Sequence, residues 1–440
     1  MKKNSMIYLF DKIGLGAAVI NRLSVQTGFI QRVRKIRPVA FLTYMMTESV
    51  RGCVSCNDLA AAIQCRSGIM ASRQAYHDKM TDAAVRFFEA ILARIMHAKV
   101  APASVSPFRH FKRILIQDST IVKLPSKLMP LFSGVKNAYA QVCNARIQCV
   151  YDLQSSTFIH WAIHTYRQTD VTVAADLSVR KGDLILRDRG YFIPTEACRI
   201  ITAGGDFISR YKHKTTLTDP HTGCEIDLFK LLKTGGLTDK QVLIGRENPI
   251  RVRLLAAPVH PDIANNRRRK AKKENKGHHP SKAVLFLLGY TVFLTSLVSK
   301  TLSINDFLGL YGLRWRIETI FKAWKSHFNF DKIHVVGENQ LHLILMARFM
   351  VITLFHEKIY VPLAKMMAEK SDKYLSMMKL MRYLVRNFSA IPALLQVADG
   401  TIRNLKIVEK YCSYDKRKRP NYIEEEHRIL RIIKTVKVLT

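Results

Sequence analysis

The chain has 440 residues, and its 70 Lys and Arg residues against 34 Asp and Glu residues give a formal net charge of +36. So basic a chain is expected to bind an extended polyanion, and nucleic acid is the first candidate. A hydrophobic content of 48% excludes a chain that is disordered throughout. The longest apolar stretch, 341–355, is broken by His342 and Arg348 and is shorter than the roughly 20 residues of a membrane span. We therefore expect a cytoplasmic protein of roughly two to four domains, with no membrane partner.

The first part of the chain, 1–105, has a helical pattern. A short helix capped at Asn57-Asp58 is followed by a turn at Gly68, and a second helical pattern covers 72–80. This order outlines a helix-turn-helix over about 57–80, whose second helix would enter the major groove of DNA. A plain helical hairpin explains the same residues, so both alternatives stay open. We assign this region to DNA binding.

Short apolar runs mixed with helical patterns follow, which is typical of an α/β fold. Strands are expected at 113–118, 146–152, 157–163 and 183–188, and a helix is expected at 170–180. The first of these strands ends in Asp118, and the last ends in Asp188 before a glycine turn. Reactive groups gather beyond strand ends in α/β folds, although either aspartate alone could be a plain strand cap.

The segment 311–325 is expected to form one helix with two chemically opposite faces. One face is apolar and suits a core; it carries Leu310, Leu313, Ile317, Ile320 and Trp324. The other face places one carboxylate among cations and aromatic rings; it carries Tyr311, Arg314, Trp315, Glu318, Lys322 and Lys325. Such a face either forms ordinary ion pairs four residues apart or follows the phosphates of a nucleic acid.

Three carboxylates from separate elements, Asp118, Asp188 and Glu318, would suit a pair of Mg²⁺ or Mn²⁺ ions, which prefer hard oxygen ligands. With two such ions, one activates the attacking oxygen and the other stabilises the leaving oxygen of a phosphodiester. We therefore predict phosphodiester hydrolysis or transfer, with these residues as catalytic and metal-binding groups.

The motifs formed by Asp118, the run Asp188-Arg-Gly-Tyr and the spacing Tyr311-x2-Arg314-x3-Glu318-x6-Lys325 resemble those of the DDE transposases of bacterial insertion sequences. The resemblance is to the family with the Tyr-Arg-Glu-Lys signature, and it covers about 110–330. It implies an RNase H-like catalytic core, a divalent metal, and cut-and-paste movement of the element that encodes the enzyme.

The resemblance also implies which residues contact DNA near the cleaved bond: Tyr311, Arg314, Lys322, Lys325, Arg189 and Arg210. The expected partners are double-stranded transposon ends and target DNA. A homodimer on paired inverted-repeat ends is expected, associated with the nucleoid when it is bound to DNA. The alternatives are a DNA-binding repressor derived from a transposase, and a metal-dependent nuclease without strand transfer.

The long segment between Asp188 and Glu318 implies a domain inserted into the catalytic core. We expect the core over 106–206 and 296–335, a β-rich insertion over 207–295, and a helical C-terminal region over 336–440 whose role stays open. Strands are expected in the insertion at 241–245, 252–257 and 283–288.

A basic run, 265–276, is expected to form a solvated loop that orders on DNA. Some members of the family stack an extruded base on a tryptophan of the insertion. Here Trp161, Trp315 and Trp324 all lie outside 207–295, so the use of a DNA hairpin during excision stays open.

Overall fold

The central feature of the computed structural model is one mixed β-sheet. The structure describes residues 5–414 and 429, apart from 33, 53–54, 99–110, 134–141, 175, 234, 275–278, 298–301, 335, 371–372 and 399–404. Nine strands of the described residues pair in the order β3-β2-β1-β4-β5-β9-β8-β7-β6. Their bounds are Arg113–Lys123 (β1), Asn144–Asp152 (β2), Thr157–Thr165 (β3), Asp183–Arg187 (β4), Asp206–Arg210 (β5), Leu217–Thr218 (β6), Thr238–Ile244 (β7), Ile250–Pro258 (β8) and Tyr290–Thr295 (β9).

The first five strands have the RNase H-like arrangement. β1 pairs parallel with β4, and β4 pairs parallel with β5. β2 lies antiparallel to both β1 and β3. β9 then pairs with both β5 and β8, so the β-rich segment continues the same sheet. The α/β fold is therefore confirmed, while the predicted domain boundaries stay predictions.

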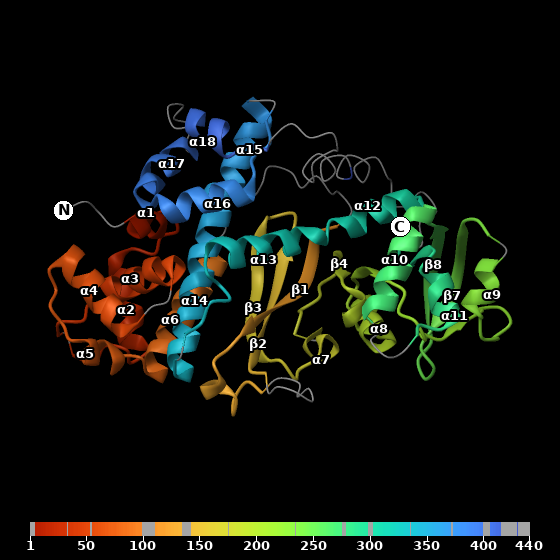
Figure 1. The fold of residues 1–440 in the computed structure, drawn as a ribbon, viewed down its shortest axis with the longest axis horizontal. Helices are drawn as coiled ribbons and strands as arrows, with labels where there is room; N and C mark the ends of the chain where they lie inside the picture. The colour runs from red at the N-terminus through yellow and green to blue at the C-terminus, as the bar shows by residue number, and fades with distance from the viewer. Residues whose placement is uncertain are drawn as a thin grey trace.

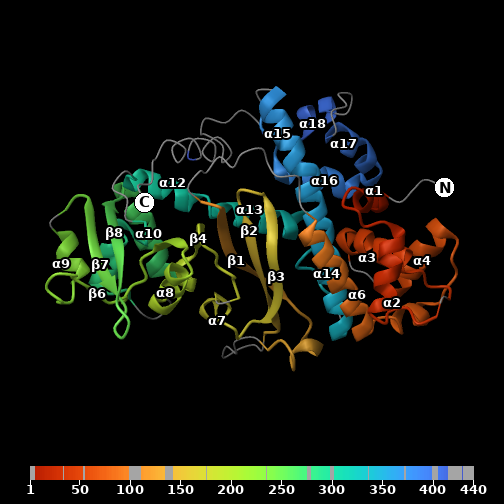
Figure 2. The same cartoon turned by 180° about the vertical axis from the view of Figure 1, so that it is seen from behind.

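Helices cover this sheet, and further helices lie beyond both of its ends (Figures 1 and 2). The N-terminal helices are Ser5–Asp11 (α1), Ala17–Gln26 (α2), Pro38–Arg51 (α3), Cys56–Ser67 (α4), Arg73–His77 (α5) and Asp82–His97 (α6). Those between and beside the strands are Asp170–Ala174 (α7), Pro194–Thr202 (α8), Leu228–Lys233 (α9), Pro261–Glu274 (α10) and Lys282–Leu287 (α11). The later helices are Ile304–Gly312 (α12), Trp315–His327 (α13), Glu338–Phe355 (α14), Val361–Lys370 (α15), Met377–Arg386 (α16), Ile391–Ala398 (α17) and Leu405–Tyr411 (α18).

Side chains of β1 and β4 alternate between the two faces of the sheet, because successive residues of a strand point to opposite sides. Leu115 and Ile185 belong to the core that α8 covers. Ile114, Ile116 and Leu186 belong to the larger core beneath α13 and α14. Both faces are covered, which explains why these strands read as continuous apolar runs rather than as alternating ones.

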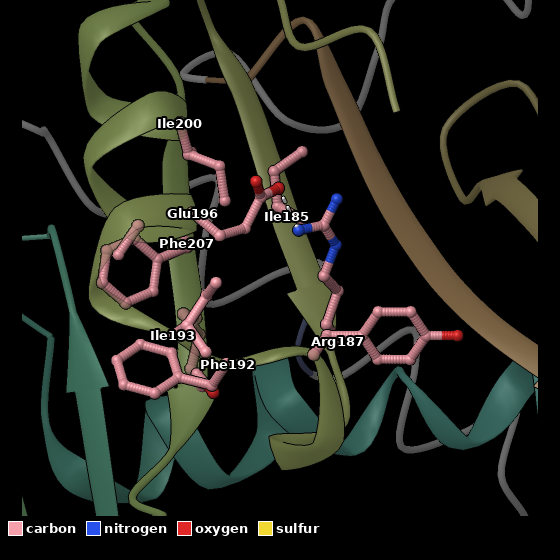
Figure 3. Close-up of a pocket in the computed structure, with 11 residues that line it drawn as sticks. Ile185, Arg187, Phe192, Ile193, Glu196, Ile200 and Phe207 are labelled. Carbon is pink, nitrogen blue, oxygen red and sulfur yellow. Dashed lines mark hydrogen bonds and ion pairs between the residues drawn. The ribbon is translucent and has the colours of Figure 1, made fainter. Parts of the chain in front are cut away.

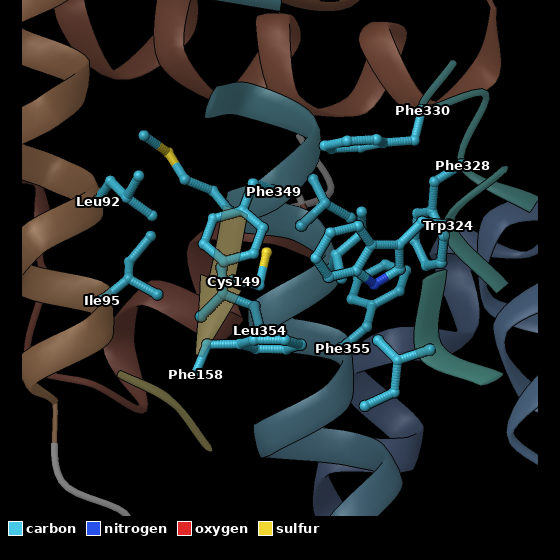
Figure 4. Packing of buried hydrophobic residues seen from close by; sticks show 14 of the residues in the cluster. Leu92, Ile95, Cys149, Phe158, Trp324, Phe328, Phe330, Phe349, Leu354 and Phe355 are labelled. Carbon is cyan, nitrogen blue, oxygen red and sulfur yellow. The ribbon is translucent and has the colours of Figure 1, made fainter. Parts of the chain in front are cut away.

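The larger core is centred on aromatic rings from three elements (Figure 4). The ring centroids of Phe158 (β3) and Trp324 (α13) lie 5.5 Å apart, and Phe349 (α14) lies 5.4 Å from the first and 5.5 Å from the second. α14 is buried along most of its length. Even so, none of the helices in the described part of the chain is long and apolar enough to span a bilayer.

Arg348, in the middle of α14, is fully buried and ties the N-terminal helices to this core. Its guanidinium donates hydrogen bonds to the carbonyl oxygens of Ser49, Gly52 and Lys332 at 2.8, 2.9 and 3.0 Å. Two of these carbonyls lie at the C-terminal end of α3, where helical carbonyls lack partners within the helix. The arginine therefore satisfies backbone acceptors that would otherwise be buried without a hydrogen bond.

The strands predicted at 113–118, 146–152, 157–163, 183–188, 241–245 and 252–257 are confirmed, with shifts of a few residues at their ends. The strand predicted at 283–288 is wrong, because these residues form helix α11, capped by the Ser281 hydroxyl. A short apolar run fits a buried strand and a helix equally well, and here the capping serine decides.

The loop predicted at 265–276 is also wrong over its described part, which belongs to α10; residues 275 and 276 lie outside the described residues. Arg, Lys and Ala favour helix, and that propensity outweighs the charge of the run. The helix expected at 170–180 shortens to α7. The helix predicted from Asn57-Asp58 begins instead at Cys56, with Ser55 as its N-cap in a reciprocal capping box with Asp58. The predicted second helix of the pair reduces to α5, and the helix-turn-helix stays a prediction.

The predicted single helix over 311–325 is interrupted. α12 ends at Gly312, and α13 begins at Trp315. The predicted apolar face is confirmed, because Leu310, Leu313, Ile317, Ile320 and Trp324 are all buried.

A buried carboxyl behind β3 gives a prediction for the pH dependence of stability. Glu357 is 2% exposed and accepts a hydrogen bond from the Phe158 N–H at 3.1 Å. Burial raises its pKa from 4.5 to about 8, which the hydrogen bond from the Phe158 N–H and the charge of Lys358 only partly offset. Because the folded pKa is the higher one, this group's stabilisation is complete below about pH 4.5 and is lost as the pH rises towards 8. We expect Glu357→Gln to raise the urea midpoint at pH 8 and to leave it nearly unchanged at pH 4.5.

The matched control is Glu338→Gln, which changes an exposed glutamate in the first turn of α14. Equal urea midpoints for the wild type and Glu357→Gln at pH 8 would contradict the assignment.

Candidate active site

The parallel pairing of β1 with β4 brings the two predicted aspartates together. The last aligned pair is Gln117 with Arg187, so Asp118 and Asp188 are the next residues along the two strands. Gln117 donates to the Val173 carbonyl at 3.2 Å and Arg187 to that of Ala174 at 2.8 Å, both at α7. Since side chains alternate, the two aspartates belong to the opposite face, the one beneath α13.

Asp188 immediately follows β4, as predicted, but Asp118 does not end its strand. β1 continues to Lys123 because β2 still pairs with it after β4 has ended. Asp118 therefore lies on a strand held on one side only. Beyond Asp188, the turn is held by Tyr191, which is buried and whose hydroxyl bonds to the Gln148 amide at 2.8 Å.

The third carboxylate, Glu318, lies in the first turn of α13. Arg314, just before that helix, joins it to β1. Its Nη1 lies 3.1 Å from Asp118 Oδ2, and its Nη2 lies 2.7 Å from Glu318 Oε1. Arg314 is only 5% exposed, and its guanidinium also lies over the rings of Tyr311 and Trp315, 5.7 and 5.3 Å from their centroids.

The electrostatics of Asp118 reflect this crowding. Burial raises the pKa of the Asp118 carboxyl to about 7, Arg314 opposes the rise, and Glu318 and Asp188 add to it. All three carboxylates are thus close enough to interact. An anionic cluster of this kind is stabilised by a nearby cation, which is Arg314 in this structure.

Three carboxylates offer the hard oxygen atoms that Mg²⁺ and Mn²⁺ prefer, so the donor chemistry of the site fits these ions. Within the described ranges, however, no three acidic, histidine or cysteine side chains are close enough together to hold an ion. Arg314 already bridges Asp118 and Glu318. A divalent ion shared by these two carboxylates would therefore compete with the guanidinium.

The predicted DNA-binding residues do not lie along one exposed helical face. Tyr311, near the end of α12, and Arg314, just before α13, are both buried. Lys322 is exposed, and Lys325 donates to the Ile121 carbonyl at 2.9 Å. Among the aromatic residues of the predicted polar face, Trp315 reaches solvent and is 55% exposed.

A cleft of about 480 Å³ reaches Asp188 and gathers several of the predicted residues. Those that line it are Asp188, Arg189, Arg210, Tyr311, Arg314 and Trp315. The prediction of site residues from the sequence missed His213, Arg267 and Lys270, which line the same cleft. The last two belong to α10, and the basic run was the signal that could have found them.

A smaller cavity of about 20 Å³ lies on the other face of the sheet (Figure 3). It is enclosed by β4, β5 and α8 and holds the buried ion pair of Arg187 and Glu196, whose atoms lie 2.5 Å apart. Its volume suits about one water molecule. This cavity belongs to the packing that fixes the end of β4 and is too small for a substrate.

Comparisons with known proteins place the chain in a family. The family model described as "Transposase DDE domain" matches residues 109–354. The chain is 26% identical to the transposase of insertion sequence IS231D from Bacillus thuringiensis subsp. finitimus, covering 77% of each protein. It is 23% identical to that of IS1151 from Clostridium perfringens, covering 94% of this chain and 93% of the relative.

A cryo-EM structure of the piggyBac transposase synaptic complex with hairpin DNA aligns with a TM-score of 0.46 and 12% identity, covering 94% of this chain and 86% of that one. This likeness is too distant to inform the site. The family match spans more than half of the chain and includes Asp118, Asp188 and Glu318. The chain therefore belongs to the family of transposases with a DDE domain.

Proposed function

We propose that this protein is a DNA transposase that binds the inverted-repeat ends of its insertion sequence and catalyses metal-dependent cleavage and strand transfer. The observation that carries the proposal is the arrangement of three carboxylates within the segment that matches the family: Arg314 bridges Asp118 and Glu318, and Asp188 follows the strand that pairs with that of Asp118. These carboxylates come from a central strand, a strand end and a helix, and they lie next to a basic cleft. This arrangement suits attack on a phosphodiester.

Within this proposal, Asp118, Asp188 and Glu318 hold Mg²⁺ or Mn²⁺. Bound divalent ions would activate the attacking oxygen and stabilise the leaving oxygen. Arg314 keeps Asp118 and Glu318 together before the ions bind. Arg189 and Arg210, which line the cleft, bind phosphates of the cut strand.

The remaining predicted residues have different surroundings. Tyr311 supports the guanidinium of Arg314 through its ring. Lys325 holds α13 to β1 through the Ile121 carbonyl, so we assign it to positioning the Glu318 helix. Lys322 is exposed on α13 and free to approach the DNA backbone.

The first test changes Glu318 to Gln, which keeps the shape of the side chain and an oxygen atom for Arg314. We expect cleavage of the element's own ends in Mg²⁺ to fall at least about 100-fold, while binding of the end duplex stays within about twofold because cations carry it. Glu247→Gln, in the exposed turn between β7 and β8, is the matched control. Wild-type cleavage by Glu318→Gln in a gel assay would show that the assignment is wrong.

The second test concerns the competition between Arg314 and a metal ion. Arg314→Gln removes the internal cation, so DNA-free protein should bind Mn²⁺ about tenfold or more tightly than the wild type, as measured by electron paramagnetic resonance. Lys322→Gln, which removes one exposed charge from α13, should leave Mn²⁺ binding unchanged. Unaltered or weaker Mn²⁺ binding in Arg314→Gln would contradict competition at this site.

The third test addresses assembly. One chain carries one set of three carboxylates, whereas excision of an element requires reactions at two ends, so we propose a homodimer on paired ends. We expect single-end DNA to be bound but cut slowly, and paired ends to be cut and joined to target DNA. Fast cutting of single ends by a species that is monomeric in light scattering, without joined product, would favour a plain nuclease. Binding without cleavage in either metal would favour a repressor.

A further inference from the structure

Helix α10 is a strongly basic element at the edge of the cleft. Its fourteen residues include six Lys and Arg residues and only two carboxylates, Asp262 and Glu274. It lies with β6–β9 at one end of the molecule's long axis, and the N-terminal helices α1–α6 lie at the other end (Figure 1). Arg267, Lys270, Ala271 and Glu274 of this helix line the cleft that also contains Asp188.

Two of the cations fasten α10 to its neighbours, one to strand β9 and one to helix α11. The Arg267 guanidinium donates to the Tyr290 carbonyl at 3.1 Å, and Arg268 donates to the Leu285 carbonyl at 3.0 Å. Ala264 lies on the same side of α10 as these two arginines and is buried. These contacts fix which side of α10 faces the protein and which side faces solvent.

The solvent side carries the remaining four cations. At 100° per residue, Lys272, Arg269, Lys273 and Lys270 fall within a sector of roughly 160° opposite Ala264. The amides of Asn265 and Asn266 share this sector, and so does one carboxylate, that of Asp262 in the first turn, which lies 3.4 Å from His260. The lysine at 270 lies 3.7 Å from Glu274 in an exposed pair, which contributes little.

The cations at 269, 272 and 273 have no carboxylate within ion-pair distance in the described part of the chain. From 265 to 273 the sector extends roughly 12 Å along the helix, enough to contact two or more phosphates of one DNA strand.

The cleft connects this surface to the catalytic carboxylates. Arg210 and Arg267 both approach the Thr291 hydroxyl, with contacts of 3.4 to 3.5 Å, and neither forms an ion pair among the described residues. Like charges that lie close together without ion-pair partners are unfavourable unless an anion joins them. A phosphate chain that leaves Asp188 along the cleft would pass these guanidinium groups and reach α10.

We infer that the outer face of α10, formed by Arg269, Lys270, Lys272 and Lys273, binds the phosphate backbone of the DNA that flanks the element, beyond the cleaved bond. The inference rests on the proposed function. DNA that is cut at the carboxylates must extend from them in both directions. The element side is assigned to the N-terminal helices, so the flanking side runs towards the opposite end of the molecule, where α10 lies.

The test uses the full chain with all four outer cations replaced by Gln (R269Q, K270Q, K272Q and K273Q). The control changes the same number of exposed cations on α9, β7 and β8 that do not line the cleft (K230Q, K233Q, K240Q and R251Q). Two labelled duplexes are compared by fluorescence anisotropy. Both carry the element's own end; one continues into roughly 20 base pairs of flank, about 70 Å of duplex, and the other stops at the cleaved bond.

We expect the α10 variant to bind the flanked duplex at least about tenfold more weakly than the control variant. Its log–log salt slope should be shallower by about 0.9 for each phosphate that the variant no longer neutralises. Binding of the duplex without flank should stay within about twofold, which also shows that the variant is folded.

Equal binding of the flanked duplex by the two variants would overturn the inference. An equal weakening on both duplexes would overturn it as well, because α10 would then bind the element itself. Cleavage of the flanked duplex by the wild type in Mg²⁺ tests the proposed function separately.

Discussion

The parallel pairing of β1 with β4 is the constraint on which the site depends. With Gln117 aligned with Arg187, the two aspartates that follow must leave the same face of the sheet. A slip of one residue would turn Asp118 towards α7 and separate the pair. The register is protected from both sides, because Gln117 and Arg187 are bound to carbonyls of α7, while Ile116 and Leu186 are buried in the core beneath α13. The register that packs the apolar side chains of β1 and β4 is therefore the same register that places Asp118 and Asp188 on one face of the sheet.

Burial of the acids creates the second requirement, a cation among them. Arg314 meets it from the break between α12 and α13, where its side chain is buried and paired with Asp118 and Glu318. A guanidinium that bridges two carboxylates stabilises the folded protein without metal, since an unpaired buried charge is costly. Because of this bridge, a divalent ion that enters the site would displace the Arg314 guanidinium from the carboxylates instead of binding to carboxylates that have no partner. A DNA phosphate that attracts Arg314 would thus favour binding of the metal, which couples substrate binding to assembly of the site.

Much of the catalytic half could be predicted from local patterns. The apolar runs that end in Asp118 and Asp188 mark strands, and the 3.6-residue spacing from Ile317 to Trp324 marks the buried side of the Glu318 helix. Other features depend on contacts distant in sequence. The length of β1 follows from its pairing with β2, and Arg314 pairs with Asp118 at a break in the helix that helical periodicity does not reveal. The basic run 265–276 was expected to be a loop because it is hydrophilic. Its Arg, Lys and Ala residues favour helix, and the described part of the run belongs to α10.

The continuous sheet fixes the position of the basic helix α10 relative to the carboxylates. β9 pairs with β5 on one side and with β8 on the other, so hydrogen bonds connect the strand next to β4 with the strands beneath α10. Arg267 then fastens α10 to the carbonyl of Tyr290 at the start of β9. A loop carrying the same charge would lose conformational entropy on binding and would leave the path of the DNA undefined. A helix anchored to the sheet has already lost that entropy and holds its cations at a fixed position relative to Asp188. The basic segment is therefore able to orient DNA at the carboxylates as well as to attract it.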